Sequence, residues 1–152
     1  DDYEKGDGQL RAADINGISA GGMICQDDNF TRFSREYGRK KVSIVAVPTM
    51  DWKQVKFAHL QSSSHRAIES RYTMVRATMN GISAIISPTG KILAQSDHFK
   101  TGSDVVVAEV PVYNCTSFFS FAGYWIVPAG FIFLVSYIVC TIDKRTKGIN
   151  VQ

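Results

Sequence analysis

The chain has 152 residues, of which 45% are apolar and 20% charged, with a formal net charge of +3. This composition is typical of a protein with a packed core and excludes a disordered chain. The basic residues are scattered apart from Arg39-Lys40-Lys41, read as a solvated helix end, and the segment 144–147, so the charge argues against a nucleic-acid-binding face. The three cysteines, Cys25, Cys115 and Cys140, lie far apart without a metal-ligand spacing. We therefore expect no metal, no cofactor and no nucleic-acid partner.

The beginning of the chain and the region around Cys25 give the first predictions. Asp1 is preceded by no methionine or signal-like stretch, and Lys5 lies among residues typical of a loop, so we expect a fragment or processed product. Residues 14–25 alternate and hold a glycine pair, which predicts a hairpin whose second strand ends at Cys25. A short amphipathic helix then ends at Gly38, with apolar residues at helical spacing: Phe30, Phe33 and Tyr37. Cys25 should stand at a strand-to-helix turn.

A buried strand and a longer helix follow. The run 42–47 is rich in β-branched residues and predicts a strand buried on both faces, which Pro48 should end. Residues 57–71 have a helical pattern. The expected core contacts of this helix are Phe57, Leu60, Ala67 and Ile68. Arg66 and Glu69 are three residues apart, and an ion pair within the helix is favoured over a contact with substrate.

The remaining soluble part is rich in strands. We expect strands at 73–78, 82–87, 92–94 and 104–110, separated by turn signals at Asn80-Gly81 and at 88–91. Strands that alternate with helices and then follow one another predict an α/β fold with a hairpin-rich end.

The apolar run from Phe118 to Ile142 carries no charge and is long enough to span a hydrocarbon core about 30 Å thick. Its aromatic pair at Tyr124-Trp125 suits a membrane interface, so the span itself could start nearer Trp125. The Lys and Arg residues in 143–152 predict that this end is a cytoplasmic tail and that the preceding domain lies on the other side.

Cys25 is the candidate for chemistry. A nucleophile that ends a strand ahead of a helix is exposed, and the amides at the helix start favour negative charge there and lower a thiol pKa. A lone cysteine after an apolar strand is, however, more often an inert buried one.

Several motifs in chain order resemble one family. They are Gly22-Met23-Ile24-Cys25 with Asp27, Val47-Pro48-Thr49-Met50-Asp51-Trp52, His59, Arg66-Ala67-Ile68-Glu69, 75–84 and Pro88-Thr89-Gly90-Lys91. The pattern resembles the C-terminal half of the carbon-nitrogen hydrolase (nitrilase) superfamily. Within it, the chain is most similar to the apolipoprotein N-acyltransferases, whose nitrilase domain is likewise followed by a last membrane helix.

The resemblance implies a fold and an activity. The fold would be part of an αββα sandwich over residues 1–112, then a linker and transmembrane helix at 113–142. The activity would use a Glu-Lys-Cys triad in which Cys25 forms a thioester. The donor would be a phospholipid and the acceptor a lipoprotein, both in the inner membrane, with the soluble domain on the periplasmic or other extracytoplasmic side.

The chain departs from that pattern in part. No motif before Cys25 matches the family's Glu and Lys. Gln26 replaces an aromatic residue, and Asp27 replaces a Glu that supports the base, although Asp27 could equally cap the helix. Thr49 and Trp52 are candidates for the substrate pocket, while Trp52 could also be a core residue. His59 and His65 are expected to be structural. The alternatives to an acyltransferase are a membrane-anchored nitrilase-type amidase and a degenerate, non-catalytic interaction module.

Overall fold

The computed structural model describes residues 7–149, with side chains described as far as Asp143. Lys5 lies outside the described residues. The chain divides into two compact units, one that ends at Phe121 and one that starts at Ala122.

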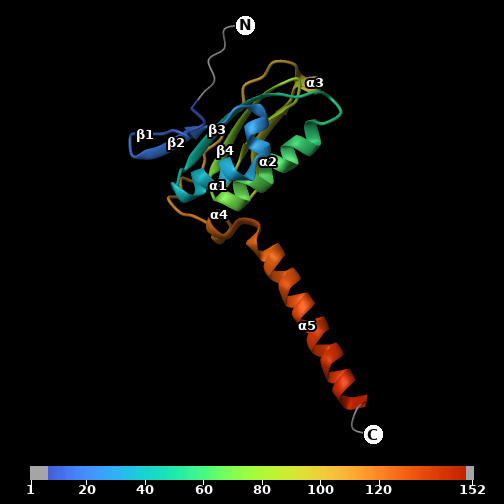
Figure 1. Ribbon diagram of the computed structural model, residues 1–152. Helices are drawn as coiled ribbons and strands as arrows, with labels where there is room; N and C mark the ends of the chain where they lie inside the picture. The colour runs from blue at the N-terminus through green and yellow to red at the C-terminus, as the bar shows by residue number, and fades with distance from the viewer. Residues whose placement is uncertain (1–6, 150–152) are drawn as a thin grey trace. The chain divides into compact units, whose positions relative to one another are not determined.

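The first unit is built on a six-stranded sheet with the order β1-β2-β3-β4-β5-β6. Figure 1 labels β1 to β4 of this sheet together with α1 and α2. The pairs β2–β3 and β3–β4 are parallel, and the other neighbours are antiparallel. The strands are β1 (Ala12–Ile15), β2 (Ile18–Gly22), β3 (Ile44–Met50), β4 (Thr73–Met79), β5 (Ile82–Ile86) and β6 (Ile92–Asp97). The helices are the 3₁₀ helix η1 (Cys25–Asn29), α1 (Thr31–Arg39), α2 (Lys56–Ser70), α3 (His98–Thr101) and α4 (Phe118–Ala122). This mixed sheet with α1 and α2 confirms the α/β prediction.

The core lies between the sheet and these two helices. Alternate residues of the central strands are buried on one side, as period 2 requires, and they meet the apolar residues of α2. The buried apolar set includes Val45, Val47, Met74, Ala84, Ile86, Leu60 and Ala67. Between described residues there is one sheet, so they form one sheet-and-helix layer of a nitrilase-like sandwich.

Two element ends differ from the sequence prediction. The second hairpin strand ends at Gly22 and not at Cys25. The Gly22 carbonyl accepts a hydrogen bond from the Tyr37 hydroxyl at 2.8 Å, so a side chain replaces a neighbouring strand as its partner. Pro48 does not end β3 but lies inside it. It is tolerated because β2 pairs with β3 only as far as Ala46, so the missing N–H of Pro48 faces an open edge.

Two of the core contacts predicted for α2 are wrong. Phe57 is 63% exposed and Ile68 is 38% exposed, whereas Leu60 and Ala67 are buried as expected. The face of α2 that meets the sheet also carries polar residues, namely Lys56, Ser63 and Ser70. The apolar pattern could not locate this face because two of these polar residues are buried with polar partners on the sheet, Lys56 with Asp97 of β6 and Ser63 with Arg76 of β4.

The strand predicted at 104–110 does not form between described residues. The segment has the alternation of a strand, since Val105 and Val107 are exposed while Val106 and Ala108 are half-buried. A strand needs the backbone of a neighbour, and none of residues 7–149 pairs with this segment. Alternation alone therefore predicted its conformation but not its pairing.

The second unit consists of the 3₁₀ helix η2 (Gly123–Trp125) and the helix α5 (Ile126–Ile149). Pro128 is tolerated because it lies in the first turn of α5, where the backbone N–H has no helical partner. By length and composition, one stretch of helix, Phe118–Asp143, could cross a membrane.

Candidate active site around Cys25

Cys25 occupies the predicted strand-to-helix turn. Strand β2 ends three residues earlier, the Met23 N–H donates to the Ala46 carbonyl at 3.0 Å, and Cys25 opens η1. Its φ is +49°, in the left-handed region that non-glycine residues rarely adopt. Such backbone strain persists where the surrounding structure imposes it, and it clusters at functional sites.

The thiol of Cys25 faces the open edge of β3. Ala46 directs its carbonyl toward β2, so Met50, four residues on, directs its backbone to the same side, beyond the point where β2 has ended. The Cys25 Sγ lies 3.9 Å from the Met50 carbonyl oxygen, a long contact that itself favours the thiol. The pKa of the Cys25 thiol is nevertheless below its usual value. The largest cause is hydrogen bonding with the Met50 backbone, and the second is hydrogen bonding with the Thr49 side chain. The contacts that favour the thiolate therefore outweigh those that oppose it.

This environment predicts the pH dependence of thiol alkylation. In a Cys115→Ser, Cys140→Ser background, the iodoacetamide rate at Cys25 should reach half its plateau below pH about 8.5, the value for a free cysteine. Thr49→Val should raise this midpoint, because it removes the second-largest contribution to the lowered pKa. Thr78→Val is the matched control, since the Thr78 hydroxyl bonds to the Ile82 carbonyl instead. A wild-type midpoint at or above that of free cysteine would contradict the assignment.

The residues after Cys25 hold η1 in shape. The Asp27 carboxylate accepts a hydrogen bond from the Ile24 N–H at 3.0 Å, so Asp27 caps the start of η1. The exposed Gln26 accepts at its side-chain carbonyl from the Asn29 amide at 2.7 Å. These bonds fix the backbone that presents Cys25.

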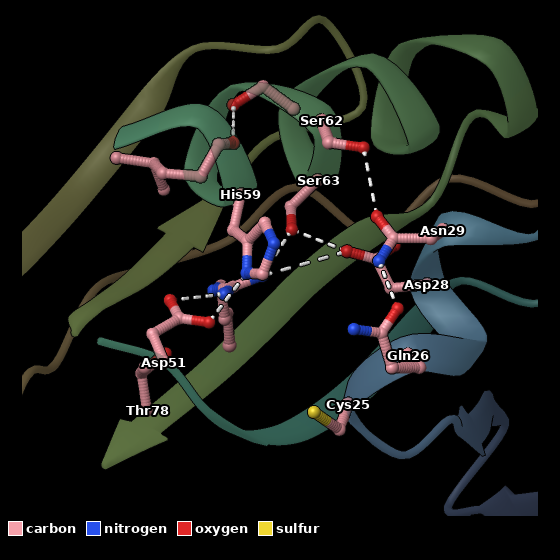
Figure 2. A network of polar contacts seen from close by, with 12 residues as sticks. Cys25, Gln26, Asp28, Asn29, Asp51, His59, Ser62, Ser63 and Thr78 are labelled. Carbon is pink, nitrogen blue, oxygen red and sulfur yellow. Dashed lines mark hydrogen bonds and ion pairs between the residues drawn. The ribbon is translucent and has the colours of Figure 1, made fainter. Parts of the chain in front are cut away.

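A buried network of charged and polar side chains lies beside Cys25, between η1, the end of β3 and α2 (Figure 2). Arg76 of β4 is its centre: Nη2 donates to Asp51 at 2.7 Å and Nη1 donates to Ser63 at 2.6 Å. Nη1 is also 3.7 Å from the Asp28 carboxylate, to which the Ser63 hydroxyl donates. On the other side, His59 Nδ1 lies 2.7 Å from Asp51. The Arg76 guanidinium therefore forms ion pairs with two buried carboxylates, those of Asp28 and Asp51.

The two carboxylates differ in how well they are satisfied. Both oxygens of Asp51 have partners at 2.7 Å. Asp28 has one oxygen, Oδ1, that is buried without a hydrogen-bond partner among the described residues. Burial accordingly raises the pKa of the Asp28 carboxyl, although Ser63 and Arg76 oppose the shift.

One cavity is lined by Cys25, and a second is lined by Met50, whose carbonyl oxygen contacts the thiol. The small one is about 10 Å³, which is the room needed for one water molecule, and it is lined by Cys25, Gln26, Asp28, Asn29, Thr49, His59 and Arg76. The larger one, about 570 Å³, is an open groove lined by Met50, Asp51, Trp52, Lys53, Asn80 and Phe99. Trp52 is 54% exposed and meets the His59 ring edge-on, so it is a groove residue and not a core residue.

The sequence-predicted site residues are therefore close together. Cys25, Gln26 and Thr49 line the small cavity, and Trp52 lines the groove. The groove is also lined by Met50, whose carbonyl oxygen contacts the Cys25 thiol. Arg66 and Glu69 form the expected intrahelical ion pair at 2.6 Å. Among the described residues no group of three or more His, Cys, Asp or Glu side chains could hold a metal ion.

Sequence reasoning missed three members of the network, Asp28, Ser63 and Arg76. A signal was present for Arg76, because it is the only charged residue of its strand and occupies an inward position, where a charge needs a buried partner. Asp28 and Ser63 gave no such signal, since an acid before a helix is usually a cap and a helix serine is usually exposed.

Comparison with known proteins identifies related sequences. The family profile described as carbon-nitrogen hydrolase matches residues 3–118. Apolipoprotein N-acyltransferase 1 of Treponema pallidum is 32% identical over 67% of this chain and 19% of that protein. Apolipoprotein N-acyltransferase of Rickettsia bellii is 30% identical over 95% of this chain and 29% of that protein. The chain thus spans less than a third of the length of these relatives.

Solved structures show the same fold. An amidase from Nesterenkonia sp. AN1 superposes with a TM-score of 0.57 at 19% identity, over 62% of this chain and 40% of that chain. That structure shows covalent addition of the acetamide moiety of fluoroacetamide at the active-site cysteine of the amidase. Together with a family match over most of the sequence, the fold and the order of motifs lead to one assignment: this chain belongs to the carbon-nitrogen hydrolase family, the nitrilase superfamily.

Proposed function

We propose that Cys25 is the nucleophile of an acyl transfer that N-acylates lipoproteins with a fatty acyl group from a phospholipid. The observation that carries this proposal is the strained turn at Cys25, where a thiol with a lowered pKa stands beside a cavity and an open groove. The relatives named apolipoprotein N-acyltransferase support the choice of substrates.

The reaction would proceed in two steps. The Cys25 thiolate attacks the ester carbonyl of the phospholipid, a C–S bond forms, and the C–O bond breaks as the lysophospholipid leaves with the proton that the general base took from the thiol. The amino group of the lipoprotein then attacks the thioester, an amide bond forms, and the thiolate is restored as the amine loses its proton. The lowered pKa of Cys25 serves both steps, because the same sulfur is nucleophile and leaving group.

The family resemblance supplies the other catalytic groups. A Glu would act as general base and a Lys would stabilise the oxyanion, and we place both in sequence that precedes Asp1 in the full-length protein. Within the described chain, Asp27 and Gln26 support the turn, and the Gln26 amide is a candidate oxyanion donor because its backbone faces the sulfur. No further cofactor is required by this chemistry.

The groove beside the thiol suits an acyl chain. Its lining includes Met50, Trp52 and Phe99, and apolar walls of this kind favour a hydrocarbon ligand. Thr49 lines the small cavity, where its side chain interacts with the thiol. We therefore assign Thr49 and Trp52 to the substrate pocket.

The proposed location is the inner membrane. Residues 1–112 would form the C-terminal part of the hydrolase domain on the periplasmic or other extracytoplasmic side, and 113–142 the linker and membrane helix. The basic residues within 143–152 favour a cytoplasmic tail. Both substrates would then be lipids or lipid-bearing proteins in the same bilayer.

The test is covalent labelling of the full-length protein. With phospholipid as donor, mass spectrometry should find a peptide of Cys25 heavier by one fatty acyl group, and Cys25→Ala should lose both the adduct and turnover. Cys115→Ala is the matched control and should keep both. Full turnover in Cys25→Ala without an adduct would overturn the mechanism.

The same experiment separates the alternatives. An adduct with a small amide but not with phospholipid would identify a membrane-anchored amidase, to which the fold likeness with an amidase lends support. Alkylation by iodoacetamide without any acyl adduct would indicate a non-catalytic interaction module.

A further inference from the structure

The short helix α4 is fastened to α1 by two arginines. Arg39 Nε donates to the Ser120 carbonyl at 2.8 Å, and Arg35 donates to the carbonyls of Ser120 and Phe121 at 3.3 and 2.8 Å. These carbonyls lie at the end of α4, where helical partners are lacking and where the helix dipole favours positive charge. The arginines therefore satisfy the helix end.

The two helices also pack closely. A Cβ atom on Gly38 would lie 2.2 Å from the Ser120 Oγ and 3.1 Å from the Ser70 Cβ, so only glycine allows this approach. Ser120 is fully buried, and the Ser117 hydroxyl caps α4 while it donates to the Glu69 carbonyl. Thus α4 is a fixed part of the first unit.

Helix α4 is close along the chain to the candidate membrane span. Four residues separate Phe121 from Ile126, where α5 begins. On the free side of α4, Phe118 is 82% exposed and Phe121 is 59% exposed. Exposed aromatic rings next to a membrane span are typical of the interfacial layer.

The face of α1 next to α4 is strongly basic. Arg32, Arg35 and Arg39 are spaced at i, i+3 and i+7 and share one stripe of the helix. Residues 31–41 hold five basic side chains and one acidic one. Their net charge of +4 exceeds the net charge of +3 of the whole chain. Among the described residues no acidic side chain forms an ion pair with these three arginines.

We propose that the arginine stripe of α1 and the exposed phenylalanines of α4 form a membrane-docking surface that binds the phosphates of anionic phospholipids. Arg32 and the terminal nitrogens of Arg39 provide the charge, and Phe118 and Phe121 enter the interfacial layer beside them. The partner is a lipid surface because the charge is complementary and the span begins four residues beyond α4. This inference rests on α5 crossing a membrane, which is part of the proposed function, but not on the chemistry of Cys25.

The test measures arginine modification in nanodiscs that contain the chain. Phenylglyoxal should modify Arg32 and Arg39 about fivefold more slowly in phosphatidylglycerol than in phosphatidylcholine, which corresponds to about 1 kcal/mol for each arginine near an anionic surface. Arg11, whose side chain is 82% exposed and forms an ion pair with Asp7, is the internal control and should react equally in both. High salt should remove the difference, because it screens exposed charges.

Variants make the test sharper. Arg32→Gln should reduce the lipid-dependent protection of Arg39, whereas Lys91→Gln, the same charge change at the exposed β5–β6 turn, should not. Gly38→Ala should reduce the protection by displacing α4, and adding Ser120→Gly should restore it by making room. Cys25→Ala should keep full protection, so failure of the catalytic proposal is distinguishable. Equal modification rates in the two lipids, or equal protection of Arg11, would overturn the proposal.

Discussion

Arg76→Met should destabilise the chain by about 3–5 kcal/mol, the cost of removing one partner from a buried ion pair. Methionine fills a similar volume without charge, so the carboxylates of Asp28 and Asp51 would both lose their cation. The two carboxylates are almost fully buried, and the cavity beside Asp28 has room for about one water molecule, so solvent cannot replace the lost cation. The measurement is the free energy of unfolding by denaturant in detergent micelles, followed by circular dichroism.

The matched control for this prediction is Arg11→Met. Arg11 forms an ion pair with Asp7 at 2.8 Å, but both side chains are largely exposed, so the loss should be much smaller than for Arg76→Met. A triple variant that adds Asp28→Asn and Asp51→Asn to Arg76→Met should recover part of the loss, because it removes the stranded charges. A cost for Arg76→Met no larger than that for Arg11→Met would show that the network contributes little to stability.

Elements of the fold that depend on neighbouring residues could be predicted from the sequence, whereas those that depend on distant parts of the chain could not. The turn at Asn80 was readable because Asn tolerates its φ of +57° and Gly81 leaves no Cβ to strike Asp51. The segment 104–110 was misjudged because pairing depends on a neighbouring backbone, which alternation along one chain cannot reveal. Phe57 was misjudged because the helix face that meets the sheet is partly polar.

The same distinction between local and long-range signals applies to the candidate site. Cys25 could be located because a strand followed by a helix is a local pattern, and its neighbours Gln26 and Asp27 followed from it. The network around Arg76 could not, because it depends on the parallel register that places Arg76 of β4 opposite Val47 of β3, close to Asp51. It also needs α2 to bring Ser63 and His59 over the same place, which is a tertiary arrangement.

Asp51→Asn should cost about 2–3 kcal/mol, whereas Asp28→Asn should cost less than about 1 kcal/mol at pH 7. Asp51 accepts short bonds from Arg76 and His59, and its charge is the closest counterion of the guanidinium. Asp28 is 3.7 Å from Arg76 and has an unpartnered oxygen, so its charge is poorly compensated. The pair of variants is matched, since each exchanges one buried carboxylate for an amide.

The pH dependence of the stability of Asp28→Asn tests whether the charge of Asp28 is poorly compensated. Burial raises the pKa of the Asp28 carboxyl, so the folded state binds this proton more tightly than the unfolded state does. The wild-type chain has this contribution in full below the ordinary aspartate pKa and loses it as pH rises through the raised value. The free energy of unfolding of Asp28→Asn relative to wild type should therefore be higher at pH 7 than below pH about 4. A relative stability that rises on acidification would mean that Arg76 compensates Asp28 better than its 3.7 Å separation implies, and that the two carboxylates share the cation equally.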